Sequence, residues 1–203
     1  FDFNHGGWDY GQPPAYFDPY TNKRLQVGIP TLKPRQQGEY LTDREADIAV
    51  QFIADHKDQP FLLYLSHYAV HTPIQAKQDV TAKYQADKDG QGQDNAAYAA
   101  MVESVDDAMG RIESTLAKHD LTDNTVVIFT GDNGGLDNNN NPTDNAPLRI
   151  GKGYAFEGGI RVPWIIRWPG VTQPASVSTQ PICSIDLFPT VAQLLGAKLP
   201  NDL

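Results

Sequence analysis

The sequence has little of what marks several large classes of proteins. It contains one cysteine, Cys183, which excludes an internal disulfide. The thiol follows Pro181–Ile182 in an apolar run, and we therefore expect it to be buried and inert. No apolar stretch approaches the roughly 20 residues of a membrane-spanning helix, so we expect no membrane span. The formal net charge of −9 argues against a nucleic-acid partner, because binding to phosphates needs Lys and Arg.

Several active-site motifs are missing as well. There is no GxSxG nucleophile elbow, and the glycine-rich stretch around Lys152 matches neither GxGxxG nor GxxxxGK followed by Ser or Thr. An EF-hand starting at Asp132 is excluded, because its loop lacks the required Gly and Glu. The chain begins at Phe1, inside sequence typical of a folded region, and ends just after an expected helix. We therefore expect it to be part of a longer protein.

What is present is typical of one globular domain, with 40% apolar and 20% charged residues in 203. Apolar periodicity predicts strands alternating with helices, and hence an α/β fold with a mostly parallel sheet and helices on both faces. Residues 1–40 are expected to form an irregular surface segment. The expected elements that follow are a helix opened by a Thr42–Glu45 capping box and broken at Gln59–Pro60, a strand at 61–66, a helix or mobile loop at 77–94, a helix at about 95–119, strands at 125–130 and 162–168, and a helix from near Asp186 to Gly196.

The strand at 125–130 leads into two oxygen-bearing side chains, Asp132 and Asn133, with glycines on either side. In α/β proteins, ligands bind beyond the carboxyl ends of the strands. Carboxylate and amide oxygens suit calcium or magnesium. The alternative is an ordinary polar turn after a strand.

Two other loops carry candidate residues. His67 and His71 follow the strand at 61–66, and their position before Pro73 argues against the helical spacing of a zinc site. A histidine at a strand end can bind an anion or act as a general acid, or it can simply pack in the loop. Lys152 stands between two glycines and is suited to phosphate or sulfate oxygens, unless its side chain is only solvated.

Taken together, these stretches resemble the formylglycine-dependent sulfatases of the alkaline phosphatase superfamily. Single pieces such as DNG are weakly specific, but the whole set in this order is very specific and covers nearly the entire chain. The matching stretches are GEYLTDREADIAVQFI, PFLLYLSHYAVHTPIQAK, YAAMVESVDDAMGRI, TVVIFTGDNGG, NAPLRIGKGYAFEGGIRVPWIIRWPG and SIDLFPTVAQLLG.

The resemblance implies roles for particular residues. Asp132 and Asn133 match the pair that binds calcium, which is expected here rather than magnesium. His71 matches a histidine that contacts the sulfate or the leaving oxygen, and Lys152 a lysine that contacts sulfate. The opening segment is expected to border the substrate pocket, which makes Asn4 and His5 further candidates. Glu157 and Arg161 are expected to shape their loop without taking part in the chemistry.

The chain departs from the family pattern in one large respect. The nucleophile of these enzymes, a formylglycine, arises within a Cys/Ser-x-Pro/Ala-x-Arg motif, which is absent from these 203 residues, and Cys183 does not fit it. We therefore expect residues 1–203 to be a partial sulfatase catalytic domain. The nucleophile-bearing N-terminal part and the small C-terminal subdomain would lie outside it, and this chain alone is expected to be inactive.

The resemblance implies a sulfuric ester hydrolase as the full-length protein, acting on a sulfated small molecule or glycan in the periplasm or outside the cell. Three alternatives stay open at this point. The first is a phosphate or phosphonate ester hydrolase of the same superfamily. The second is a catalytically inactive, anion-binding remnant. The third is a calcium-stabilised adhesion module, although such a module would not need the His71 and Lys152 loops.

Overall fold

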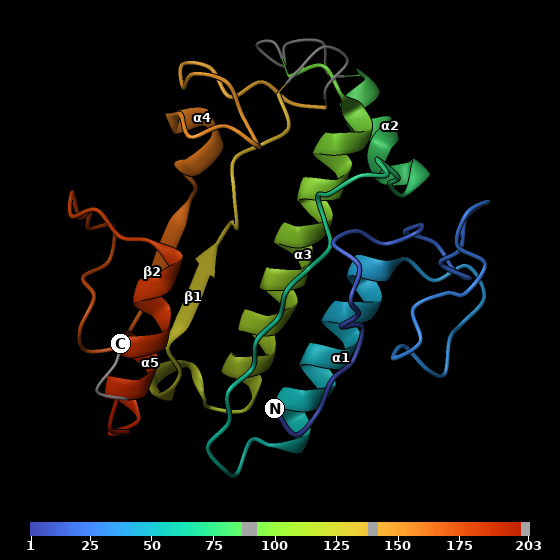
Figure 1. Cartoon of the computed structure of the whole chain (residues 1–203). Helices are drawn as coiled ribbons and strands as arrows, with labels where there is room; N and C mark the ends of the chain where they lie inside the picture. The colour runs from blue at the N-terminus through green and yellow to red at the C-terminus, as the bar shows by residue number, and fades with distance from the viewer. Residues whose placement is uncertain (87–92, 138–141, 200–203) are drawn as a thin grey trace.

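The computed structural model describes residues 1–86, 93–137 and 142–199 (Figure 1). Parts of two stretches considered above, 77–94 and the loop after residue 131, lie outside the described residues. The helices are α1 (Leu41–Asp55), α2 (Gln78–Ala86), α3 (Ala96–Lys118), α4 (Glu157–Ile160) and α5 (Leu187–Leu194), and the strands are β1 (Val127–Thr130) and β2 (Trp164–Arg167). Short 3-10 turns at Thr122–Asn124 and Ser184–Asp186 precede β1 and α5.

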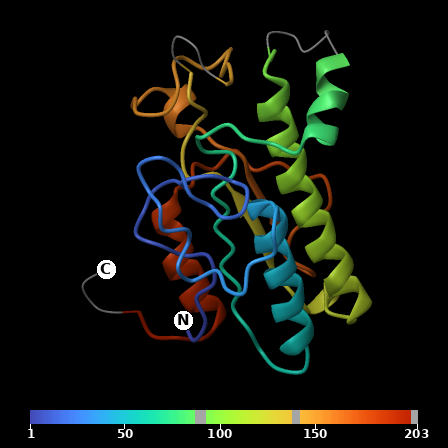
Figure 2. The same ribbon diagram turned by 90° about the vertical axis from the view of Figure 1, so that its right-hand side faces the viewer.

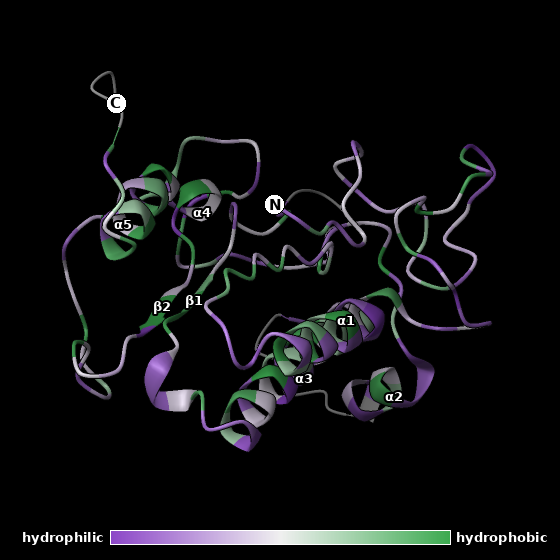
Figure 3. Ribbon diagram, turned by 90° about the horizontal axis from the view of Figure 1, so that it is seen from below, coloured by the Kyte–Doolittle hydropathy of each residue, from purple (hydrophilic) through white to green (hydrophobic). Residues whose placement is uncertain are grey.

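Helices lie on both sides of the β1–β2 pair. Seen from below, α1 and α3 cover one side and α5 the other (Figure 3). The pair is antiparallel, with Val127 opposite Arg167 and Thr130 opposite Trp164. The expected α/β fold is confirmed, whereas the strand pair found among the described residues does not run parallel. The connection from β1 to β2 explains this, because it turns back at one end of the sheet, whereas a parallel pair needs a crossover along the sheet face.

Along residues 61–66, more buried and more exposed side chains alternate as in a strand, but the backbone is not paired with a neighbouring strand among the described residues. Phe61, Leu63 and Leu65 pack against the apolar cluster of α1 and α3, while Leu62 and Tyr64 are 57% and 71% exposed. No ladder partner for this segment occurs in the part of the chain that the structure describes. The period-two pattern therefore predicts the extended backbone correctly, and the expected fully buried strand is not found.

The long helix α3 closely matches its prediction. Asn95 caps it, because its side-chain oxygen accepts a hydrogen bond of 2.9 Å from the Tyr98 amide. Its buried face packs on α1, where Ile112 and Leu116 meet Ala49 and Ile53. These contacts fix the orientation of α1, which carries a residue important below.

The start of α1 differs from the prediction. The helix begins at Leu41, its N-cap is Tyr40, and no side-chain cap bond is made. Thr42 and Glu45 are both buried inside the helix, so the capping box is wrong. Glu45 turns to a partner in another segment, as described below.

Two other expectations need correction. Residues 1–40 are irregular, as predicted, but they are more than a surface segment, because Tyr16, Tyr20 and Leu32 are fully buried in a cluster with Leu41 and Met101. Cys183 is an exposed free thiol. The residues around it, 173–186, are all exposed or partly exposed, so the local apolar run finds no core to enter.

Candidate active site

The loop after β1 leads to the region of α4, and the loop after residues 61–66 runs toward the same end of the molecule. Figures 1 and 2 agree on this in two views related by a quarter turn. Both segments run toward that end, and β2 returns from it. The three candidate stretches predicted from the sequence therefore come from loops at one end of the fold.

The loop after β1 carries Asp132, which is exposed, and Asn133, which is half-buried. The Asn133 side-chain amide donates a hydrogen bond of 2.9 Å to the carbonyl oxygen of Gly134. This contact occupies the amide nitrogen and leaves its oxygen available as a ligand. Among the described residues, no hydrogen bond or ion pair engages the Asp132 carboxylate.

The Lys152 loop is joined to the loop after β1 by backbone hydrogen bonds. The Lys152 amide donates to the Gly135 carbonyl oxygen at 2.9 Å, and Gly134 donates to Gly159 at 2.9 Å. The Asn145 side chain donates to the same Gly135 oxygen at 2.9 Å and to the Ile150 oxygen at 3.2 Å. The segments of Lys152 and of Asp132 are thus held together as one unit.

Glycines make this contact possible. A Cβ atom on Gly134 would overlap the carbonyl oxygen of Gly158, and one on Gly158 would overlap that of Ile150. Any side chain at these positions would force the two loops apart. Glu157, the first residue of helix α4, and Arg161, which follows the helix, form an exposed ion pair of 3.3 Å.

The His71 loop is fixed by tyrosines of the N-terminal segment. The Tyr16 hydroxyl donates to the His71 carbonyl oxygen at 2.9 Å, and the His71 amide donates to the Tyr68 carbonyl at 2.8 Å. Both backbone groups of His71 are therefore paired. Further along, the side-chain oxygen of Gln75 accepts a hydrogen bond from the Tyr16 amide at 2.8 Å. The backbone carbonyl of Gln75 accepts one from the Tyr40 hydroxyl at 3.0 Å.

The His71 ring is oriented by its own neighbour. Nδ1 lies 3.0 Å from the carbonyl oxygen of Thr72 and 3.2 Å from its hydroxyl. Because a carbonyl can only accept, the tautomer that satisfies this contact carries its proton on Nδ1. Nε2 is then the unprotonated nitrogen of the neutral ring.

Asn4 and His5 lie in an exposed segment that is held in place by its neighbours. The Asn4 side chain donates a hydrogen bond of 3.4 Å to the Gly7 carbonyl oxygen, which also accepts from the Thr31 hydroxyl at 3.0 Å. The buried Gly6, with φ of 79°, faces the side chain of Glu45. The structure shows no contact of Asn4 or His5 with His71 or Lys152 among the described residues, so their role in the site stays a prediction.

Glu45 and His67 form a buried pair that the sequence pattern does not reveal. The His67 Nδ1 lies 2.7 Å from a Glu45 carboxylate oxygen, and the two side chains are 9% and 6% exposed. Burial raises the pKa of Glu45 above its ordinary value, although the hydrogen bond and charge of His67 act in the opposite direction. The only signal in the sequence was a charged residue on the apolar face of α1.

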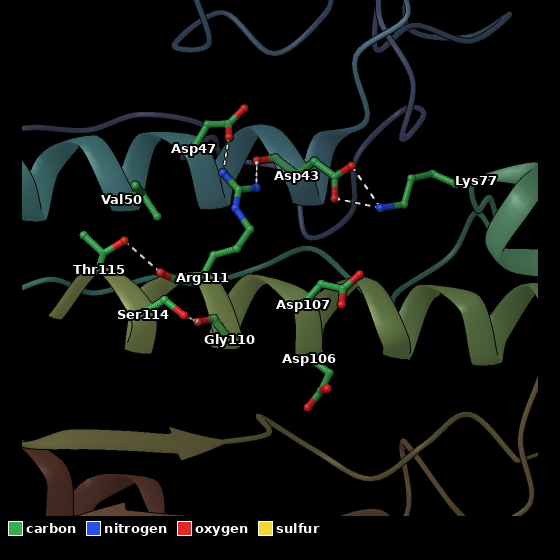
Figure 4. A pocket seen from close by; sticks show the side chains of 10 residues that line it. All are labelled: Asp43, Asp47, Val50, Lys77, Asp106, Asp107, Gly110, Arg111, Ser114 and Thr115. Atoms are coloured by element: carbon green, nitrogen blue, oxygen red, sulfur yellow. Dashed lines mark hydrogen bonds and ion pairs between the residues drawn. The ribbon is translucent and has the colours of Figure 1, made fainter. Parts of the chain in front are cut away.

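A groove between α1 and α3 lies apart from these loops (Figure 4). Its charges are largely paired: Asp43 contacts Lys77 at 3.0 Å, and Asp47 contacts Arg111. None of the residues predicted for the site lines it. Its hydrogen-bonded side chains serve to join the two helices and α2.

The residues present fit part of a calcium shell. Asp132 and Asn133 offer the hard oxygens that calcium prefers, in a loop pinned by backbone hydrogen bonds. Calcium takes about six to eight oxygens, so two side chains are an incomplete set. Within residues 1–86, 93–137 and 142–199, no group of three or more His, Cys, Asp or Glu side chains is arranged to hold a metal.

Comparison with known proteins gives one consistent family. A family model described as Sulfatase matches residues 1–197. A sulfatase of Formosa agariphila is 40% identical over 208 residues, covering 92% of this chain and 36% of that protein. The steryl-sulfatase of Rattus norvegicus is 40% identical over 168 residues, covering 80% of this chain and 28% of its own length.

Solved structures agree with the sequence comparison. Ps i-CgsB superimposes with a TM-score of 0.76 at 34% identity, over 88% of this chain and 40% of that one. The same protein in complex with k-i-k-neocarrahexaose gives a TM-score of 0.77 at 32% identity, over 98% of this chain and 45% of that one. The chain thus spans less than half the length of these relatives. On the family model, the identity to known sulfatases and the shared fold, this chain belongs to the sulfatase family.

Proposed function

We propose that this chain is part of the catalytic domain of an enzyme that hydrolyses sulfate esters of carbohydrates. The observation that carries the proposal is the joining of the Lys152 loop to the loop of Asp132 and Asn133 through Gly135. The course of the His71 loop toward the same end of the fold supports the proposal that a lysine, an acid–amide pair and a histidine from distant parts of the sequence act in one site.

In this proposal, each residue has one task. The Lys152 ammonium binds sulfate oxygens as a point charge. Protonated His71 donates its Nε2 proton to the oxygen of the leaving alcohol, while Nδ1 stays bonded to the Thr72 carbonyl. Asn4 and His5 border the space for the sugar. The alternative task for His71 is to bind a sulfate oxygen through the same nitrogen.

Asp132 and Asn133 would hold a calcium ion through the carboxylate and the amide oxygen. Bound there, calcium would offset negative charge on the sulfate group. The remaining ligands and the formylglycine nucleophile are expected on polypeptide outside these 203 residues. Sulfate transfer is therefore an activity of the longer protein.

A sulfated glycan is the preferred substrate class, because one structural neighbour was solved with a carrageenan-type oligosaccharide, k-i-k-neocarrahexaose. A polysaccharide substrate would place the enzyme in the periplasm or outside the cell. No helix in the described ranges is long and apolar enough to cross a membrane.

The experiment that tests the proposal is sulfate release by the longer protein that contains this chain. We expect release from a sulfated oligosaccharide, loss of most activity in Lys152→Ala, and no loss in Lys118→Ala, which removes an exposed lysine at the end of α3. Faster hydrolysis of the matching phosphate or phosphonate ester would favour the other branch of the superfamily. Sulfate binding without turnover would indicate an inactive remnant.

A further inference from the structure

The Glu45–His67 pair has no task in the proposed reaction, yet both side chains are buried. Glu45 projects from α1, and His67 stands at the end of the extended segment 61–66. Their contact of 2.7 Å joins the helix to the loop that carries His71.

Stability alone does not account for this pair. Burial raises the pKa of Glu45 even though His67 favours the ionised form, so the buried carboxylate is an unfavourable element of the fold. The Nε2 of His67 is buried and has no hydrogen-bond partner in the described structure. Buried ion pairs are often no more stabilising than apolar residues of similar volume. The burial of this carboxylate beside a ring nitrogen that lacks a hydrogen bond indicates that the pair serves a function.

The location of the pair supplies that reason. Directly after His67, the Tyr68 carbonyl accepts the hydrogen bond from the His71 amide, so fixing His67 fixes the start of this turn. On its other side, Glu45 backs Gly6, where a Cβ atom would lie 3.9 Å from its second carboxylate oxygen. Asn4 and His5 immediately precede Gly6. One buried carboxylate thus bonds the first candidate segment and lies beside the second.

We propose that Glu45 is a positioning residue: its carboxylate holds His67, and through it the turn that carries His71, while supporting the Asn4–Gly6 segment. This role rests on the proposed function, because the proposed function defines what the positioned His71 does. The positioning itself is a property of this chain and can be measured without catalysis.

The test compares three variants of the 203-residue chain. Glu45→Leu removes the hydrogen bond to His67 and replaces the carboxylate side chain with an apolar one of similar size. Glu45→Gln removes the charge, but its amide oxygen can still accept from His67 Nδ1. Asp47→Leu is the matched control on the same helix, because Asp47 is exposed and, within the described ranges, is paired with Arg111 alone. The measurements are the NMR signals of the His71 ring nitrogens, the free energy of unfolding, and calorimetric binding of sulfate with calcium present.

We expect Glu45→Leu to move the His71 signals and to weaken sulfate binding roughly tenfold, since a misplacement of about 1 Å can cost up to 100-fold at a site. The free energy of unfolding should fall, because the buried His67 ring loses its hydrogen-bond partner. Glu45→Gln should restore the wild-type signals and affinity, and Asp47→Leu should change neither. Should Glu45→Leu not fold, Glu45→Met takes its place, because methionine adapts to irregular space.

Unchanged His71 signals in the apolar variant would overturn the positioning role, as would equal effects of the glutamine and leucine variants. The two proposals fail in different ways. If the wild-type chain binds no sulfate, the anion site is contradicted, and the His71 signals still decide the role of Glu45. If sulfate binds and the apolar variant leaves His71 undisturbed, only the positioning role is lost.

Discussion

The hydroxyl of Tyr16 donates a hydrogen bond of 2.9 Å to the carbonyl oxygen of His71, which lies 55 residues further along the chain. Tyr16 is fully buried and stacks on Tyr40 with ring centroids 5.9 Å apart. Burial raises the pKa of Tyr16, so its hydroxyl stays protonated and acts as a donor. The irregular N-terminal segment therefore helps to shape the candidate site from inside the core.

Tyr16→Phe should lower the free energy of unfolding by about 1–3 kcal/mol, because the His71 carbonyl loses its partner in a buried place. Denaturant unfolding of the isolated chain measures this. The ring and its packing are kept, so the loss reports the hydroxyl alone.

Tyr20→Phe is the matched control for this experiment. Tyr20 is also fully buried in the same cluster, and its hydroxyl makes no well-formed hydrogen bond among the described residues, although burial and the nearby Glu39 carboxylate raise its pKa. Removing it should therefore cost less than about 0.5 kcal/mol or stabilise the chain slightly. Equal losses in both variants would mean that the Tyr16–His71 contact contributes nothing specific.

Gly158→Ala should disrupt the joint between the Lys152 loop and the loop after β1. The added methyl group would overlap the Ile150 carbonyl, which is backbone and cannot swing aside. We expect a loss of at least about 2–3 kcal/mol, comparable to other severe steric changes. Thermal unfolding monitored by circular dichroism would detect it.

Gly110→Ala serves as the control for the glycine experiment. Gly110 lies on an exposed face of α3, and a Cβ there meets nothing within 4 Å. Since alanine favours helix over glycine by about 0.5–1 kcal/mol, this variant should be more stable than the wild type. A loss of stability there would contradict the packing described for α3.

The buried carboxylate of Glu45 predicts a definite pH dependence. Its pKa is raised from the ordinary value of 4.5, so its contribution to stability is fully present below that pH and is lost as the pH rises. Relative to Glu45→Gln, the wild type should therefore lose stability as the pH rises above the ordinary pKa of a glutamate. His67, Tyr16, Tyr40 and Tyr68 face the group and must be kept in the comparison.

Glu103→Gln should reveal the opposite dependence of stability on pH. The pKa of Glu103 is lowered by its hydrogen bonds from Lys83 and Tyr84, so its contribution is lost as the pH falls. Unfolding curves at several pH values should thus show the two variants diverging from the wild type in opposite directions. A pH-independent difference for Glu45→Gln would show that its carboxyl group is not perturbed by burial.

Asn145→Ala tests how the lysine is held. The variant loses the two side-chain hydrogen bonds to Gly135 and Ile150, so the Lys152 amide should exchange its hydrogen faster. Gln51→Ala, which removes an exposed contact to Asp55 on α1, is the control. Unchanged exchange at Lys152 would mean that the backbone bonds alone are sufficient.

Local patterns in the sequence predict the helices well. Apolar residues at steps of three and four define α3, and Asn95 caps it within one residue of the predicted start. The alternation at 61–66 likewise predicts an extended backbone. Its pairing was not predictable, because a ladder depends on which strands lie beside it and not on the segment itself.

The candidate site likewise contains residues that the sequence indicates and residues that only the structure reveals. Asp132, Asn133, His71 and Lys152 carry recognisable motifs, and their segments do lie at one end of the fold. Glu45, Tyr16 and Asn145 carry none, because their importance comes from contacts between distant segments. The spacing of Thr42 and Glu45 matches a capping box, but in the structure the Glu45 side chain contacts His67 instead.

The most direct test of the central claim is a sulfate titration of the isotope-labelled chain with calcium present, followed by NMR at the amides of His71, Asn133 and Lys152. If the three segments form one anion site, all three signals shift together with a single dissociation constant, and Lys152→Ala weakens that constant for all of them. Three unrelated binding curves, or shifts confined to the groove between α1 and α3, would contradict it.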